Sequence, residues 1–573
     1  MKDGLIMGGI YGGSNITGTI SNDVTMHIDG GQVGTTTQAA NIHGGGYGQA
    51  TRVLGSVNLT LGIEDCDTVV DGVTVYGDVY GGSAEGRTNG NTSRTSGAET
   101  NVKLYHGTIY GAIYGGGLGT KTPDHPAIVY GPVAVKVYGG SVRTNDGTGE
   151  NGSGGVFGCN NVNGAPQGNV TVDIYGTDSA EAGHEFALYA VYGGGNRSDY
   201  DRTPVVTIHG CKNHIEYVYG GGNASAVRGT NVTIWGGHIG NAFGGGNGYS
   251  VTGNHGDPSA DHYNPGANIT ADGTNLTIHG GTIDAAFGGS NQYGYINTTI
   301  TVTVEEHTES ANDPCTGSAY KPCDNLIVEL YGGGNQAPAV TQEDAYISPD
   351  VIISSCDMRI TNLFGGAKNA NHGADINLEV TKGKFENVFG GNNLGGTITG
   401  NVTLTLKGGT MTNAFGGNNM GGSITGTITV LVDSTGTECP LKVDNVYGGG
   451  NQAAYEPDDA TAATPTVNFV NGTVRNAVFG GGLGSAAKIT ANPTVNIGGT
   501  GSKHAVVGGT RINGTKGDGN VYGGGSQADV LKDGAGTGNT SVTLSGHATV
   551  KGNVYGGGNE ANVEGNSSVK LEE

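Results

Sequence analysis

The sequence predicts an all-β protein that forms a single parallel β-helix, and three observations support this fold class. An aromatic residue followed by two or three glycines and usually an asparagine recurs along the chain, as in Tyr192–Asn196 and Phe243–Asn247. Copies lie from 24 residues (Tyr219 to Phe243) to 44 residues (Phe243 to Phe287) apart, and a period of roughly 20 to 50 residues is typical of solenoids, propellers and arrays. Short Val, Ile, Leu and Thr segments separate the copies, and no stretch keeps the apolar period of an α-helix.

The least interrupted repeat lies between Phe389 and Tyr447. Short β segments at 397–399, at 401–406 and before Phe415 are separated by glycine corners within about 26 residues. Parallel strands are normally joined by a helix, but a coil of three strands needs only turns. The unit therefore predicts one rung of a β-helix. Residues 1–573 are expected to form one continuous solenoid, right-handed like the usual parallel crossover, with about 17 to 20 rungs.

Two patterns predict the buried side chains. In Val402-Thr403-Leu404 the two aliphatic residues share one face of a strand, so they are expected inside while the threonine faces solvent. Before each aromatic residue, apolar side chains are three apart, as in Ile239 and Ala242. An odd spacing places them on opposite faces of a straight strand, so burial of both predicts a corner.

The motif itself is expected at the next corner, where columns of like side chains stack. Glycine adopts a positive φ without steric cost and lets stacked backbones approach, and asparagine tolerates the same left-handed region. Repeated about every 4.8 Å, amides and rings are expected to form structural ladders. The predicted ladder residues are Tyr192, Tyr219, Phe243, Phe287, Tyr331, Phe389, Phe415, Tyr447, Asn196, Asn223, Asn247, Asn335 and Asn451. Asn392 and Asn418 also end copies of the motif.

Each column has an alternative function. The residue before each ring is usually aliphatic and competes for the inward position, so the rings could form an outward ridge that binds sugars or a partner. The asparagines could bind a ligand instead of one another.

Composition excludes several classes of protein. Glycine makes up 114 of 573 residues without a Gly-X-Y triplet, which excludes collagen, and 35% hydrophobic residues in short runs argue against disorder. The formal charge of −23 without basic clusters argues against nucleic acid. No window is apolar enough to span a membrane, and the first residues run directly into a repeat without a signal peptide.

Cysteine usage is sparse, with seven residues in the chain. Cys315 and Cys323 bracket an insert that contains glycine and proline, and they are candidates for a loop-closing disulfide. No Cys-x-x-Cys pair suggests zinc.

Polar insertions of variable length are expected at corners, where a solenoid tolerates them and where specificity should lie. They fall at about 83–100, 144–155, 251–267, 306–324 and 453–464. The third holds the densest group of candidate metal ligands, His255, Asp257, Asp261 and His262, which are equally ordinary in a solvated loop. No calcium-binding repeat or phosphate-loop motif accompanies them, so no cofactor is expected.

Catalytic patterns are scarce. Enzymes on β-helices group carboxylates or basic residues on one strand face, whereas the aspartates here lie mostly in turns and inserts. An ice-binding surface needs a broad Thr-x-Thr array, and most rungs offer one threonine. Asn-x-Ser/Thr sequences such as Asn401 are interpreted as strand-start asparagines, because glycans about 4.8 Å apart would crowd.

With Val-Tyr-Gly-Gly-Gly-Asn at 191–196, 218–223, 446–451 and 554–559, the chain resembles glycine-rich repeat regions of large surface proteins from anaerobic gut-type bacteria. More broadly it is similar to the β-helical stalks of adhesins and autotransporter passengers. Because the repeat is rich in structural columns and poor in paired catalytic groups, we expect a stalk on the outside of a bacterial cell, not an enzyme, whose corner insertions contact a host glycan or protein surface. The resemblance implies an extracellular rod. It transfers no catalytic residue. The alternatives are a carbohydrate-active enzyme or binding module on the same scaffold, and a self-assembling filament subunit.

Neither end reads as a polar cap, because ordinary repeat sequence reaches both Ile6–Tyr11 and Ser567–Leu571. A solenoid normally closes with capping repeats. Two interpretations remain: the chain belongs to a longer array, or copies stack end to end.

Overall fold

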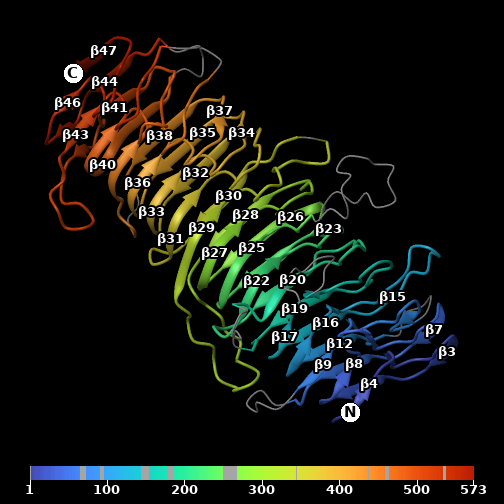
Figure 1. The fold of residues 1–573 in the computed structure, drawn as a ribbon. Coiled ribbons are helices and arrows are strands. Elements are labelled where there is room, and N and C mark those ends of the chain that lie inside the picture. Colours follow the sequence, from blue (N-terminus) through green and yellow to red (C-terminus); the bar gives the residue numbers. More distant parts are fainter. Residues whose placement is uncertain are drawn as a thin grey trace. The chain divides into compact units, whose positions relative to one another are not determined.

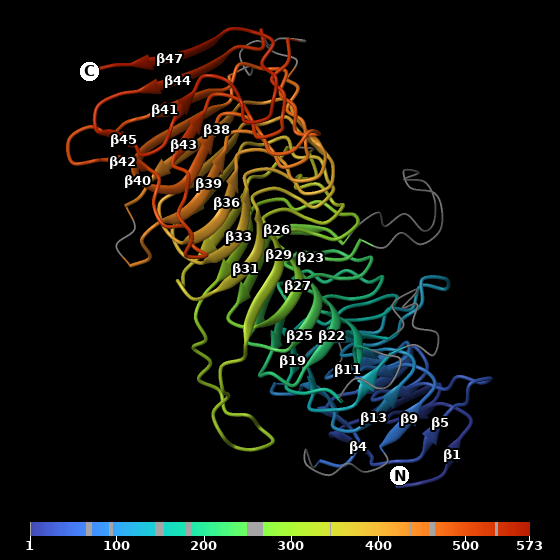
Figure 2. The same cartoon turned by 60° about the vertical axis from the view of Figure 1, so that its left-hand side comes forward.

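The computed structural model forms two compact units. It describes residues 2–64, 72–90, 96–143, 154–178, 185–248, 267–343, 345–435, 438–457, 464–532 and 537–573. Unit 1 comprises Met1–Asp284, Ser290–Thr298 and His307–Asn325, and unit 2 comprises Ala285–Gly289, Thr299–Glu306 and Leu326–Glu573. All regular structure in these ranges is β-strand (Figures 1 and 2). No helix that could cross a membrane is found among them.

Unit 1 is built from short strands. They are β1 (Leu5–Ile6), β2 (Ile10–Tyr11), β3 (Thr17–Ile20), β4 (Val24–Ile28), β5 (Gln32–Val33), β6 (Ile42–His43), β7 (Ala50–Val53), β8 (Val57–Leu61), β9 (Val73–Val75), β10 (Val79–Tyr80), β11 (Arg87–Thr88), β12 (Thr100–Leu104), β13 (Gly107–Ile109), β14 (Ile113–Tyr114), β15 (Ile128–Val129), β16 (Val133–Val137), β17 (Ser141–Val142), β18 (Gly155–Phe157), β19 (Val170–Ile174), β20 (Leu188–Tyr192), β21 (Val205–Ile208), β22 (His214–Tyr219), β23 (Val227–Gly229), β24 (Asn231–Ile234), β25 (His238–Phe243), β26 (Ile269–Ile278) and the start of β27 (Gly281–Phe287).

Unit 2 continues with the end of β27 and the later strands. These are β28 (Ile300–Val304), β29 (Asn325–Tyr331), β30 (Pro349–Ile353), β31 (Arg359–Phe364), β32 (Ile376–Val380), β33 (Lys384–Phe389), β34 (Thr397–Ile398), β35 (Val402–Leu406), β36 (Thr410–Phe415), β37 (Ser423–Ile424), β38 (Ile428–Asp433), β39 (Lys442–Tyr447), β40 (Thr466–Phe479), β41 (Thr494–Ile497), β42 (Ala505–Val507), β43 (Asn520–Tyr522), β44 (Thr540–Leu544), β45 (Ala548–Val550), β46 (Val554–Tyr555) and β47 (Ser567–Leu571).

Within each unit, strands from successive copies pair in parallel and in register. In unit 1, Val102 of β12 pairs with Leu59 of β8 and Val135 of β16. In unit 2, Phe415 of β36 pairs with Phe389 of β33 and Tyr447 of β39. The all-β class and the parallel sheets predicted from the sequence are therefore confirmed.

The predicted three-segment repeat is present in unit 2 as β34, β35 and β36. Val402 and Leu404 are fully buried, while Thr403 between them is partly exposed, as the alternation predicted. The insertion expected at 83–100 includes a short strand, β11, which pairs with β7 and β15.

The expected corner before each aromatic residue takes a different form. Ile360 and Leu363 are both buried, yet β31 runs through both. The register with β33 is continuous across this segment, joining Ile360 to Phe385 and Asn362 to Asn387. The change of face therefore occurs inside a strand, and no turn is needed.

The motif glycines are required for space and not for a positive φ. None of those that directly follow the aromatic column adopts φ > 0 in the described copies. A Cβ on Gly193 would lie 2.3 Å from the carbonyl oxygen of Gly220, and one on Gly390 would lie 2.5 Å from that of Gly416. The expected φ of these glycines was wrong, whereas the close backbone approach was right.

In some described copies a left-handed residue lies one position after the motif asparagine. Gln452, which follows Asn451, has φ 57°, and Glu560, which follows Asn559, has φ 56°. The motif asparagines themselves have negative φ in the described copies. Their side chains therefore serve another purpose.

Candidate functional site

The aromatic positions form stacked ladders within each unit. Ring centroids of neighbours lie 4.4 to 5.0 Å apart. The members are Tyr11, His43, Tyr80, Tyr114, Phe157, Tyr192, Tyr219 and Phe243 in unit 1, and Phe287, Tyr331, Phe364, Phe389, Phe415, Tyr447, Phe479, Tyr522 and Tyr555 in unit 2. All predicted ladder rings are among them.

The ladder rings are buried together with the residues that precede them. Phe243 and Ala242 are both buried, as are Phe389 and Val388. Only the rings at the two extremes, Tyr11 and Tyr555, are exposed. The alternative of an outward aromatic ridge is therefore wrong for the predicted rings, which lie inside and stabilise the stack.

Asparagine amides form a second ladder beside the rings. In unit 1, Nδ2 of Asn196, Asn223, Asn247 and Asn291 donates in turn to Oδ1 of the preceding asparagine, beginning with Asn161, over 2.8 to 2.9 Å. In unit 2, Asn451 donates to Asn419 and Asn419 to Asn393, each over 2.8 Å. The predicted structural ladder is confirmed for Asn196, Asn223, Asn247 and Asn451. Asn335 also has an interaction partner in the structure, and its place in the ladder stays a prediction.

Asn392 and Asn418 are not members of that ladder. They replace the third glycine of the motif, and each Oδ1 accepts a backbone N–H from the preceding copy, that of Ala367 or Asn392. The hydroxyl of Ser290 does the same for Gly246. A polar side chain at this position thus satisfies a buried N–H.

A further asparagine ladder was missed in the sequence. Asn387 donates to Asn362, Asn413 to Asn387, Asn445 to Asn413 and Asn476 to Asn445, over 2.7 to 3.0 Å. The signal was present as an asparagine two residues before Phe364, Phe389, Phe415 and Tyr447. The apolar spacing of the same segment does not indicate this ladder, because the asparagines lie between the apolar positions.

The strand-start interpretation of the Asn-x-Ser/Thr sequences has support at Asn401. Its Oδ1 accepts the backbone N–H of Thr427 in the next copy, over 3.0 Å. The side chain therefore has a structural task.

The candidate metal ligands His255, Asp257, Asp261 and His262 lie outside the described residues. Elsewhere, within the ranges that the structure describes, no group of three or more His, Cys, Asp or Glu side chains is placed to hold a metal ion.

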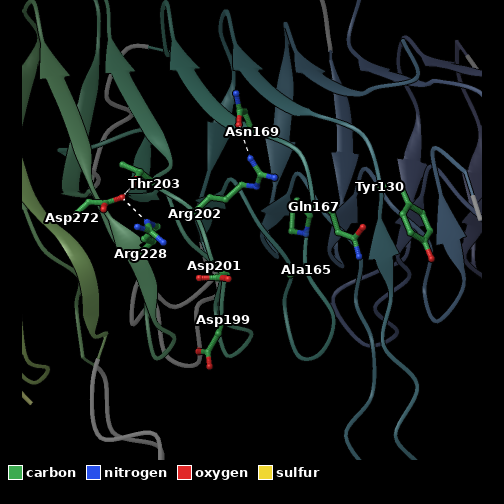
Figure 3. A pocket seen from close by; sticks show the side chains of 11 residues that line it. Tyr130, Ala165, Gln167, Asn169, Asp199, Asp201, Arg202, Thr203, Arg228 and Asp272 are labelled. Carbon is green, nitrogen blue, oxygen red and sulfur yellow. Dashed lines mark hydrogen bonds and ion pairs between the residues drawn. The ribbon is translucent and has the colours of Figure 1, made fainter. Parts of the chain in front are cut away.

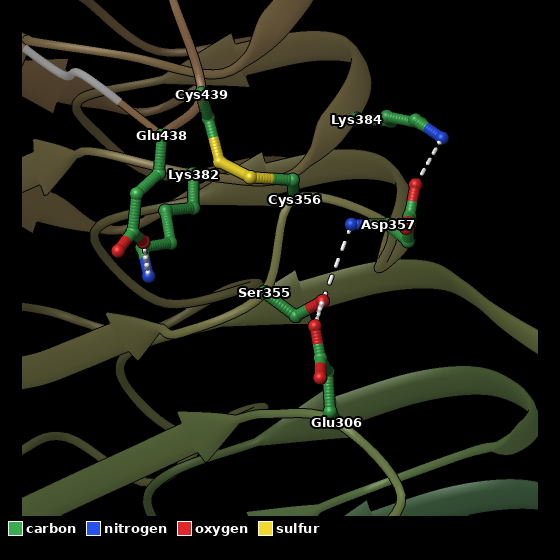
Figure 4. The surroundings of a disulfide bond; sticks show 8 residues. All are labelled: Glu306, Ser355, Cys356, Asp357, Lys382, Lys384, Glu438 and Cys439. Carbon is green, nitrogen blue, oxygen red and sulfur yellow. Dashed lines mark hydrogen bonds and ion pairs between the residues drawn. A yellow bond between two sulfur atoms is a disulfide. The ribbon is translucent and has the colours of Figure 1, made fainter.

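The disulfide pairing corrects the sequence prediction. Cys323 pairs with Cys211, 112 residues away, and not with Cys315. Cys315 is itself disulfide-bonded, and Cys356 pairs with Cys439 in unit 2. Proximity in sequence was misleading, because residues in successive copies are neighbours in space. Figure 4 shows the second bridge between the ion pairs Lys382–Glu438 (2.6 Å) and Lys384–Asp357 (2.7 Å).

An open groove in unit 1 is lined by charged and amide side chains (Figure 3). Its volume is about 980 Å³, and its lining includes Gln167, Asn169, Asp199, Asp201, Arg202, Arg228 and Asp272 from successive copies. Arg228 Nε donates to Asp272 Oδ2 over 2.9 Å, and Arg202 Nη1 donates to Asn169 Oδ1 over 3.4 Å. Most of the donors on Arg202 remain available for a ligand.

The electrostatics of the groove suit binding better than acid catalysis. Hydrogen bonds from Thr203 and Arg228 hold the pKa of Asp272 below its ordinary value. A catalytic general acid needs the opposite shift. Guanidinium, carboxylate and amide groups in a row can instead hydrogen-bond to hydroxyl-rich or acidic ligands.

No known protein family, curated protein or solved structure matches this chain.

Proposed function

We propose that each unit is a right-handed parallel β-solenoid and that the chain is an extracellular structural and adhesive stalk of a bacterial surface or secreted protein. The observation that carries this proposal is the use of the repeated side chains. Aromatic rings, asparagine amides and glycines of the motif all make contacts between successive copies. What varies between copies is left at the surface for contact with a partner.

Two further features support the proposal. Successive parallel strands are joined without a helix in the described ranges, which a coil of strands achieves with turns alone. Disulfides that join distant residues are typical of oxidising, extracellular compartments.

Adhesion of beads coated with the purified chain to mucin and to a glycan array tests the adhesive function. We expect beads carrying the folded chain to adhere and beads carrying the heat-unfolded chain not to adhere. Release of reducing ends or unsaturated sugars from the same glycans would instead support the enzyme alternative.

The groove in unit 1 favours carbohydrate binding as the second candidate function. If it contacts a glycan, Arg202→Ala should weaken adhesion while Arg359→Ala, an exposed arginine of unit 2, should not. Equal adhesion of both variants would place the contact elsewhere.

A further inference from the structure

Residues 307–325 of unit 1 pack against the C-terminal ends of successive strands of one sheet, at the positions that directly follow those strands. Leu104, Val137, Ile174, Ile208, Ile234 and Ile278 are aligned by the pairing of β12, β16, β19, β21, β24 and β26. The residues after them form an outer aromatic row: Tyr105, Tyr138, Tyr175, His209, Trp235 and His279. We call residues 307–325 the strap.

The first part of the outer aromatic row is uncovered. Tyr105, Tyr138 and Tyr175 are stacked at centroid distances of 4.4 and 5.0 Å and are partly exposed. The strap contacts the row from His209 onward, where His209 and His279 are buried and Trp235 is partly exposed. Tyr320 of the strap stacks on His209 at 5.9 Å, and His307 meets the edge of Trp235 at 5.6 Å.

His209 bridges the sheet and the strap. Its Nδ1 lies 2.6 Å from Glu309 Oε1 on the strap, and its Nε2 lies 3.3 Å from Asp173 Oδ1 on β19. The side chain of Glu309 is only 2% exposed, so an ionised carboxylate there needs a charged partner. Burial alone would lower the pKa of His209, but the hydrogen bonds to Asp173 and Glu309 outweigh it and raise the pKa.

A disulfide also holds the strap to the sheet. Cys211, two residues beyond His209, is bonded to Cys323 of the strap, and Cys315 in the middle of the strap is also disulfide-bonded. Glycines lie beneath the strap, where a side chain would overlap it. A Cβ on Gly210 would lie 2.6 Å from the ring of Tyr320, and one on Gly236 would lie 2.1 Å from Sγ of Cys323.

The closed strap also carries uncompensated polar groups. Glu309 Oε2, the Tyr320 hydroxyl and both ring nitrogens of His307 are buried without a hydrogen-bond partner. Each such group costs about 1 to 3 kcal/mol. These costs oppose closure of the strap, which therefore depends on the disulfide and on the His209 bridge.

We propose that the strap is releasable, held shut by the Cys211–Cys323 disulfide together with the His209 bridge between Asp173 and Glu309, and that its opening uncovers His209 and further exposes Trp235. The titratable groups around His209 are Asp173 and Tyr175 from the preceding copy, and Glu309, Asp313 and Tyr320 from the strap.

The direction of the pH effect follows from the bridge. The pKa of His209 is higher in the closed state than in the open state, so protonation of His209 stabilises closure. That contribution is complete below the ordinary pKa of histidine and is lost as pH rises through the raised value. The neutral ring then leaves Glu309 buried without a countercharge.

The test uses the single tryptophan as a reporter. Acrylamide quenching of Trp235 and chymotryptic cleavage after Tyr320 are measured on oxidised and reduced protein at pH 5.5 and 8.5, with cleavage normalised to an unfolded substrate. We expect both signals to rise only in reduced protein at pH 8.5, by about tenfold for each unit of pKa difference between the closed and open states.

Two variants and a control isolate His209. Reduced His209→Gln should be released equally at both pH values, and Asp173→Asn should move the midpoint of release to lower pH. His547→Gln, an exposed histidine of unit 2, should behave as wild type. Reduced wild type that stays protected at pH 8.5, or His209→Gln that keeps the pH dependence, would overturn the proposal.

Discussion

At the scale of single residues, the space between successive copies decides which side chains are allowed. The backbones of adjacent motif corners approach so closely that a Cβ on an interior glycine would overlap the next copy. In the copy at 554–559, a Cβ on Gly557 would meet no backbone atom of another copy within 4 Å. The same motif position therefore offers both a severe and a mild test.

Gly481→Ala is expected to destabilise unit 2 by about 3 kcal/mol, because the new Cβ would lie 2.6 Å from the backbone nitrogen of Gly525. Gly557→Ala is the matched control, since the nearest atom to its Cβ, on Val563, is 3.9 Å away. Thermal unfolding of both variants checks the difference. Equal melting temperatures would contradict the close-approach explanation.

His372 is a second residue whose effect can be measured. It is buried opposite Ile398, its Nε2 lacks a partner, and burial lowers its pKa to about 4. Between about pH 6.5 and 4 the histidine is protonated in the unfolded chain but not in the folded chain. The free energy of unfolding therefore decreases as the pH is lowered through this range, by about 3 kcal/mol in total.

His372→Leu is therefore expected to make unit 2 more stable than wild type at pH 4.5, with a smaller difference at pH 8. Denaturant titrations at the two pH values measure this. His547→Gln, which changes an exposed histidine, should keep the wild-type slope. A His372→Leu variant with the same acid sensitivity as wild type would show that another group is responsible.

At the scale of the element, the asparagine ladder links copies through a chain of hydrogen bonds. Asn223 donates to Asn196 and accepts from Asn247, and its side chain is buried. Each amide is donor and acceptor at once, without carrying a charge. A carboxylate of the same shape keeps the acceptor and loses the donor.

Asn223→Asp should cost unit 1 about 3 kcal/mol at pH 7, because it buries an ionised group without its donor. Burial raises the pKa of the introduced carboxyl, so the loss should shrink as pH falls and the acid is protonated. Urea unfolding at pH 4 and 7 measures both effects. The control is Asn513→Asp, whose exposed Oδ1 keeps its bonds from Thr515. A pH-independent loss would refute the ladder account.

At the scale of the whole molecule, stability is distributed along stacked copies, each in contact with its neighbours. The two described disulfides each lie within one unit and join copies that are distant in sequence. Their contributions should accordingly stay within the unit that holds them.

Replacing Cys356 and Cys439 together by alanine should cost unit 2 about 4.5 kcal/mol, the loop-closure value for a separation of 83 residues. Hydrogen exchange separates the units: protection of β35 and β38 should fall, whereas β12 and β16 should be unchanged. Equal loss of protection in β12 would show that the two units unfold as one.

The sequence by itself determined the strand content, the parallel repeat, the inward aliphatic residues, the aromatic ladder and the asparagine ladder at the end of the motif. These depend on local periodicity and on the fact that identical copies stack in register, so one copy describes its neighbours. Glycine was correctly placed at close backbone contacts for the same reason.

Only the tertiary structure decided which cysteines pair, which residue takes the left-handed conformation, and where the strap lies. His209 and Cys211 belong to the repeat, whereas their partners Glu309 and Cys323 belong to the insertion at 307–325. Their proximity depends on how many residues each intervening copy holds and on the path of a loop without periodicity. Neither quantity is written in the local pattern of the chain.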